Sequence, residues 1–217
     1  MQTELITVLD MDSREEALHA VDLCGTCQYF KIGSQLFTRC GPAIVQEILG
    51  KGKNVFLDLK FHDIPNTVAK AARGAADLGV ALFTLHAMGG RRMIEAAREA
   101  VEGTNTKILA VTVLTSLSDE MLRDEVGLPE TTSEAVVRLA KQSVESGAHG
   151  IVSSPQETAL VREAVGLKPV LVTPGIRPAW STGKDDQLRI TTPRQAAEAG
   201  ANFIVVGRPI FKHENPA

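Results

Sequence analysis

Short, nearly unbroken apolar runs alternate along the whole chain with longer segments in which apolar residues recur at helical spacing. The short runs predict eight strands, near residues 5–9, 29–33, 54–60, 81–86, 107–114, 149–152, 169–173 and 203–206. Apolar strands that alternate with helices are typical of a parallel sheet covered on both faces. Eight such units in 217 residues predict an α/β fold, a (β/α)8 TIM barrel that forms a single domain over residues 1–217.

The ends of this pattern complete the fold prediction. Ser13 and Glu16 have the spacing of a capping box, so a helix is expected from there to about Cys24. After the last strand only residues 208–212 and a polar tail follow, so the eighth outer helix is expected to be missing. Whether the natural chain continues past residue 217, or is joined to another domain, stays open. An open doubly wound sheet is disfavoured because no Gly-x-Gly-x-x-Gly follows the first strand.

Composition and charge narrow the classes of partner. A formal net charge of -3 gives no reason to expect nucleic acid or an acidic membrane surface. No apolar run reaches the roughly 18 residues that a membrane-spanning helix needs, and no signal peptide is visible, so a cytoplasmic location is expected. Cys24 and Cys27 match a redox Cys-x-x-Cys in spacing, but they close a helical pattern instead of opening one.

The strongest polar signal follows the third strand, over residues 58–68. Side chains alternate between the faces of a strand, so Asp58 and Lys60 are expected to point to the same side, with Asp63 just beyond. The simplest alternative is an exposed salt bridge worth about 0–1 kcal/mol. If the charges were dry and unpaired, they would instead cost several kcal/mol.

Polar side chains also follow the other predicted strands, and in a barrel the carboxyl ends of all strands meet at one mouth, where active sites lie. The polar residues at these ends are Asp10, Lys31, Asp58, Lys60, His86, Thr115, Ser116, Ser153, Ser154, Thr173 and Arg208. Alternating charges there can partly neutralise one another, as buried charge requires. The set predicts an active site, although His86 could equally be a packing residue.

The loops after strands seven and eight are common phosphate sites in such barrels. Glycine lets backbone N–H groups approach an anion, and arginine offers a bidentate fork. The residues expected to serve this purpose are Pro174, Gly175, Arg177, Gln187, Gly207 and Arg208. The long polar loop over residues 174–192 is expected to act as a lid, with an ordinary surface loop as the alternative.

Over nearly its whole length the chain resembles the orotidine monophosphate decarboxylase family. Four motifs in matching order carry this resemblance, at residues 58–67, 112–116, 173–178 and 206–209. The resemblance implies decarboxylation of orotidine 5'-monophosphate to uridine 5'-monophosphate, the last step of de novo pyrimidine nucleotide synthesis. It implies no metal and no cofactor.

The resemblance also implies roles for individual residues. Lys60 resembles the proton donor, and Asp58 the carboxylate placed against the departing carboxyl group. Lys31 and Asp10 resemble the groups that orient the charged network and the ribose hydroxyls. Asp63 and Thr67 resemble residues that reach the neighbouring subunit's site, which implies a homodimer. The other residues implied to contact substrate are Ile64, Thr115, Ser116, Pro174, Arg177, Gln187, Gly207 and Arg208.

Two alternatives remain beside this interpretation. One is a related sugar-phosphate decarboxylase or aldolase-type barrel that uses magnesium. By resemblance such enzymes have an acidic residue at the end of strand two, where this chain has Lys31, whose charge would repel the cation. The other is a non-catalytic barrel that binds a phosphate ligand, in which Lys60 would have no reaction to support.

Overall fold

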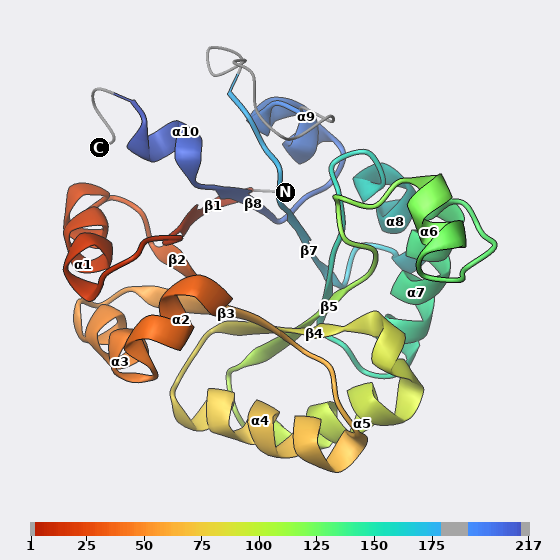
Figure 1. Ribbon diagram of the computed structural model, residues 1–217, viewed down its shortest axis with the longest axis horizontal. Coiled ribbons are helices and arrows are strands. Elements are labelled where there is room, and N and C mark those ends of the chain that lie inside the picture. Colours follow the sequence, from red (N-terminus) through yellow and green to blue (C-terminus); the bar gives the residue numbers. More distant parts are fainter. Residues whose placement is uncertain (1–2, 179–190, 214–217) are drawn as a thin grey trace.

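Eight parallel strands close into a barrel in the computed structural model, which describes residues 3–178 and 191–213 (Figure 1). Each strand pairs with the next along the chain, and the last pairs with the first. The strands are β1 Glu4–Val8, β2 Tyr29–Gly33, β3 Asn54–Phe61, β4 Leu82–His86, β5 Lys107–Val111, β6 Gly150–Val152, β7 Val170–Thr173 and β8 Phe203–Val206. The predicted (β/α)8 barrel is confirmed.

Helices surround the strands as an outer ring (Figure 1). They are α1 Arg14–Leu23, α2 Ser34–Cys40, α3 Ala43–Gly50, α4 Pro65–Asp77, α5 Gly90–Ala100, α6 Asp119–Asp124, α7 Thr132–Glu145, α8 Thr158–Val165, α9 Pro193–Glu198 and α10 Arg208–Phe211, with a short 3-10 helix η1 Ala87–Gly89 before α5. Within the described residues, no helix has both the length and the apolar character needed to cross a bilayer.

Three local predictions need correction. The sequence did not reveal α2, because Gly33 gives it no side-chain cap and Leu36 is its only fully buried residue. The chain after β8 is not without a helix, since α10 forms a single short turn there. The capping box of α1 is half formed. The Ser13 hydroxyl accepts the Glu16 N–H at 3.2 Å, but the Glu16 carboxylate accepts the N–H of Asp12 instead of that of Ser13.

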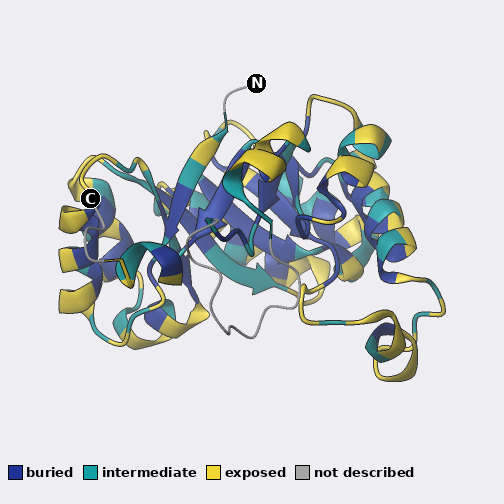
Figure 2. Ribbon diagram, turned by 90° about the horizontal axis from the view of Figure 1, so that it is seen from above, coloured by how far each residue is buried: buried dark blue, intermediate teal, exposed yellow. Residues whose placement is uncertain are grey.

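Alternate residues of each strand supply two separate cores. In β3, Phe56 packs inside the barrel lumen with side chains such as Leu82 of β4, whereas Val55 and Leu57 pack outward against the helices. Figure 2 shows the result, with buried strands inside helices whose outer faces are exposed. The lumen is therefore filled with apolar side chains up to the level of Asp58, the next inward-facing position of β3.

The end of β3 departs from regular strand geometry. Leu57 pairs with Phe83 of β4, but the next pairing joins Phe61 to Leu85, so β3 advances by four residues while β4 advances by two. Lys60 lies inside this irregularity with φ of +52°, and it is the only residue other than glycine with positive φ in the described chain. The sequence predicts a regular strand here, so this bulge is a correction.

Candidate active site

Four charged side chains of alternating sign form a chain across the barrel mouth. Lys60 Nζ lies 2.9 Å from both carboxylate oxygens of Asp58. Lys31 Nζ, from β2, lies 3.6 Å from the same carboxylate and 3.1 Å from Oδ1 of Asp10, which follows β1. The Asp58 and Lys31 side chains are only 13% and 12% exposed, whereas that of Lys60 is 36% exposed. The structure thus brings together in one chain of contacts four of the residues predicted from the strand ends.

Opposing effects act on the Asp58 carboxyl group. Burial raises its pKa, because a charged carboxylate loses water. The charges of Lys31 and Lys60, with hydrogen bonds from Lys60 and Thr84, act the other way and prevail, so the pKa lies below its ordinary value. Asp58 is therefore ionised at neutral pH and balances the two ammonium groups beside it.

Two residues that the sequence did not single out make this arrangement possible. Thr84 of β4 is 1% exposed, accepts the N–H of Lys60 at 2.9 Å and donates its hydroxyl to Asp58 Oδ1 at 2.9 Å. Gly33 ends β2 beside the cluster, where an added Cβ would lie 2.8 Å from Lys31 Nζ. The feature of the sequence that could have identified Thr84 is its single hydroxyl within an otherwise apolar strand.

His86 lies at the end of β4, next to the cluster. Its ring is 5.4 Å from that of His62, measured between centroids. Burial, His62 and Lys60 lower the pKa of His86, in that order, so its ring is neutral at pH 7. It does not line either cavity described below, and its packing against His62 does not assign it a chemical role.

Two adjoining cavities open beside the charged chain. The inner one, of about 180 Å³, has Asp58 and Lys60 on one wall, and Thr115 also lines it. Its other walls are mostly apolar and come from Phe56, Val111, Val113, Leu114, Val152 and Val205. The buried hydroxyl of Ser153, which has no hydrogen-bond partner among the described residues, borders the same space.

The outer cavity, of about 430 Å³, shares Lys31, Pro174 and Val205 with the inner one, so the two form one elongated site. The other polar residues and glycines that line it are Asp10, Gly175, Arg177, Gly207, Arg208 and Lys212. Three cationic side chains thus border one space at the ends of β7 and β8. Such a cavity suits an anionic group such as a phosphate. Lys212 is a member that the sequence interpretation did not include.

Other predicted residues lie away from these cavities. Asp63 and Ile64 are exposed between β3 and α4, and Thr67 is exposed in the first turn of α4. Among the described residues, Asp63 accepts the adjacent N–H of Ile64, at 2.6 Å. Ser116 is exposed beyond β5 and lines neither cavity. Gln187 and most of the predicted lid lie outside the described residues.

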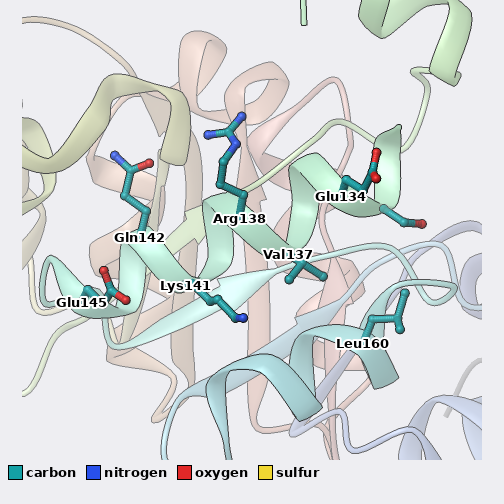
Figure 3. A pocket seen from close by; sticks show the side chains of 8 residues that line it. Glu134, Val137, Arg138, Lys141, Gln142, Glu145 and Leu160 are labelled. Carbon is teal, nitrogen blue, oxygen red and sulfur yellow. The ribbon is translucent and has the colours of Figure 1, made fainter. Parts of the chain in front are cut away.

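A larger hollow, of about 620 Å³, lies on the outer surface along α7 and reaches Leu160 of α8 (Figure 3). Two of its charged side chains form surface pairs, Arg138 with Glu130 at 2.6 Å and Glu145 with Arg91 at 3.7 Å, and Glu134 caps its own helix at Thr131. Size alone therefore does not identify a reactive site, and the chemistry points to the barrel mouth. No group of three or more acidic, histidine or cysteine side chains able to hold a metal occurs in the described parts of the chain.

Comparison with known proteins identifies a family and close relatives in sequence and structure. The family model described as "Orotidine 5'-phosphate decarboxylase / HUMPS family" matches residues 3–217. A protein of Heliobacterium modesticaldum named orotidine 5'-phosphate decarboxylase is 51% identical over 95% of this chain and 88% of its own length. One of Saccharophagus degradans with the same name is 50% identical over 98% of this chain and 90% of its own. A crystal structure of orotidine 5'-phosphate decarboxylase from Lactobacillus acidophilus superposes with a TM-score of 0.88 at 38% identity, over 99% of this chain and 94% of that one.

Proposed function

This chain belongs to the orotidine 5'-phosphate decarboxylase / HUMPS family, as a carboxy-lyase that converts orotidine 5'-monophosphate to uridine 5'-monophosphate in pyrimidine biosynthesis. From that premise we propose that the barrel mouth carries out this reaction with its own side chains, without metal or cofactor. The observation that supports the proposal is the chain of charges Asp10–Lys31–Asp58–Lys60, which reaches the wall of a mostly apolar cavity through Lys31, Asp58 and Lys60.

Lys60 has the central role in the proposed mechanism. Loss of carbon dioxide from a ring carbon that has no adjacent carbonyl acceptor leaves a localised negative charge. An ammonium group held in place stabilises that charge as it forms and then supplies the proton that replaces the carboxyl group. The salt bridge with Asp58 fixes the Lys60 Nζ at the cavity wall before substrate arrives.

Asp58 and the apolar walls act on the other side of the reaction. An ionised Asp58 beside a substrate carboxylate raises the energy of the bound ground state. The repulsion ends when the carboxylate becomes neutral carbon dioxide. Val111 and Val152 also favour the neutral product over the charged group, because they cannot solvate a charge.

The outer cavity would hold the 5'-phosphate. Arg177 and Arg208 offer forked donors, and Lys212 adds a third positive charge. Contacts to a group that does not react can supply the binding energy that holds the reacting ring against Asp58 and Lys60. Asp10 and Lys31 lie between the two ends and suit the ribose hydroxyls.

We propose in addition that two copies of the chain form a homodimer with shared sites. Asp63 forms no ion pair with the described residues of its own chain, and Thr67 is also exposed. Exposed apolar side chains follow β3 and β4 at this end of the barrel, Ile64 at 66% and Met88 of η1 at 43%. Exposed apolar surface of this kind is suited to a protein interface. A partner docked there would receive Asp63 and Thr67.

The magnesium-dependent barrel is the second candidate, because the family description covers more than one name. The position of Lys31 disfavours it. An ammonium group 3.6 Å from Asp58 occupies the neighbourhood that a divalent cation would need, and like charges there repel.

An ultraviolet assay with orotidine 5'-monophosphate, with and without EDTA, tests the proposal. We expect turnover that EDTA does not change. The variant Lys60→Ala should lose turnover but still bind uridine 5'-monophosphate, because the outer cavity is intact. Lys51→Ala is the matched control, since Lys51 pairs with Asp22 on the surface far from the mouth. Strict dependence on magnesium, or wild-type turnover by Lys60→Ala, would contradict the proposal.

A further inference from the structure

Thr84 is a hydroxyl residue where the barrel pattern calls for an apolar one. It lies at the centre of β4, and its neighbours Phe83 and Leu85 belong to the outer core. Leu82, two residues earlier, packs in the lumen, so strand alternation places Thr84 on the lumen side as well. With 1% exposure its hydroxyl depends on protein partners for its hydrogen bonds.

The two partners of this hydroxyl fix the direction of both hydrogen bonds. The Lys60 N–H can only donate, and it donates to Thr84 Oγ1 at 2.9 Å. The ionised carboxylate of Asp58 can only accept, so the hydroxyl proton points to its Oδ1 at 2.9 Å. One oxygen thus joins the backbone of the proposed proton donor to the side chain of its counter-ion.

The bulge in β3 explains why the Lys60 N–H needs a side chain of β4 as its hydrogen-bond acceptor. Between the Leu57–Phe83 and Phe61–Leu85 pairings, β3 has two residues more than β4. The Lys60 N–H is therefore donated to the Thr84 hydroxyl and not to a β4 backbone carbonyl. Positive φ is unfavourable for a residue with a Cβ, and it persists only where surrounding contacts hold it.

We propose that Thr84 is a positioning residue for the decarboxylation: its hydroxyl holds the Lys60 backbone in the left-handed conformation and orients the Asp58 carboxylate. Without it, the salt bridge between Asp58 and Lys60 loses both of its anchors to β4. This inference rests on the proposed function of Lys60 and extends it to a residue that lines neither cavity.

A set of three variants separates positioning from simple packing. Thr84→Val keeps the shape and removes the hydroxyl, whereas Thr84→Ser keeps the hydroxyl and removes a methyl group. Thr7→Val is the matched control, because Thr7 is 0% exposed on β1 and its hydroxyl has no partner among the described residues. All three are assayed by steady-state kinetics with orotidine 5'-monophosphate, and their folding is checked by circular dichroism.

For Thr84→Val we expect kcat to fall by about 10- to 100-fold, the loss that corresponds to a hydrogen bond with a charged group. KM should change little, because the outer cavity is untouched. The hydrogen bond from Thr84 helps to lower the pKa of Asp58, so its removal should move the acid limb of kcat/KM to higher pH. Thr84→Ser should restore kcat to within about threefold of the wild type, and Thr7→Val should leave it unchanged.

The outcomes distinguish this inference from the proposed function. If the wild type turns over its substrate and folded Thr84→Val keeps wild-type kcat and pH profile, the inference is wrong and the proposed function stands. If Thr84→Ser loses as much kcat as Thr84→Val, packing and not the hydroxyl is responsible, which also overturns it. Should Thr84→Val fail to fold, Thr84→Ala takes its place against Thr84→Ser. A wild type without turnover refutes the proposed function itself.

Discussion

Asp58→Asn is the most direct perturbation of the charged chain, because it removes one charge and keeps the shape of the side chain. The Asp58 carboxylate lies 2.9 Å from Lys60 Nζ and 3.6 Å from Lys31 Nζ. At an effective dielectric constant of about 20 these separations correspond to about 6 and about 5 kcal/mol of attraction, before the cost of desolvation is subtracted. Removing one partner of a buried pair typically costs about 3–5 kcal/mol in net terms.

The solvent exposure of Lys60 reduces the destabilisation that its unpaired ammonium group would cause. Lys31 keeps Asp10 as a partner at 3.1 Å, while the Lys60 side chain is 36% exposed and regains some hydration. We therefore expect Asp58→Asn to lower the free energy of unfolding by about 2–3 kcal/mol at pH 7, a fall in Tm of about 4–12 °C. Turnover should also fall, because Lys60 Nζ is no longer fixed at the cavity wall.

The effect should depend on pH in a defined direction. The folded-state pKa of Asp58 lies below its ordinary value, so its stabilisation is complete above that value and disappears as the pH falls through the folded-state pKa. The difference between Asp58→Asn and the wild type should be constant from pH 7 to about pH 5 and shrink below about pH 4. Urea unfolding at several pH values measures it.

Asp22→Asn is the control for this experiment. Asp22 lies 2.7 Å from Lys51 Nζ, a shorter distance than either pair of Asp58, but its side chain is 61% exposed. An exposed pair contributes only about 0–1 kcal/mol, so this variant should be close to the wild type in stability at every pH. If Asp58→Asn were as stable as the wild type at pH 7, or equally destabilised at pH 7 and pH 3.5, the electrostatic reasoning would be refuted.

Two further predictions concern the dimer and the lumen. Lys60→Ala and Asp63→Ala, each inactive alone, should regain about a quarter of wild-type activity when mixed, because half of the dimers then hold one intact shared site; no recovery after subunit exchange would exclude sharing. Gly150→Ala would place a Cβ 2.3 Å from the Val170 carbonyl oxygen and should lower the free energy of unfolding by about 1–3 kcal/mol, measured in urea, whereas Gly50→Ala, which meets nothing within 4 Å, should not.

The sequence predicted the barrel because strands buried on both faces have unbroken apolar runs, which are easy to locate and count. It also placed Asp58 and Lys60 on one side, through regular alternation. The structure reaches their contact by a different route, with two extra residues in β3 and a left-handed Lys60. That conformation depends on Thr84, which is 24 residues away in sequence, so local preferences could not reveal it.

Local signals also failed where the elements are very short. Ser34–Cys40 has no capping side chain and a single fully buried residue, and α10 is a single turn, so neither element gives a strong local signal. Lys212, which borders the outer cavity, follows directly after this short helix. The sequence pattern places Asp63 and Thr67 near the third strand. Their predicted role lies in the active site of a second copy of the chain.

The irregular pairing of β3 with β4 has a consequence for protein engineering. A segment carrying Asp58 to Phe61, transplanted alone into another eight-stranded barrel, would arrive with two surplus residues and an amide lacking its acceptor. The smallest portable unit of this chemistry is therefore a pair of adjacent strands that includes Thr84. Recombination points that separate β3 from β4 should yield barrels that fold but place the ammonium wrongly.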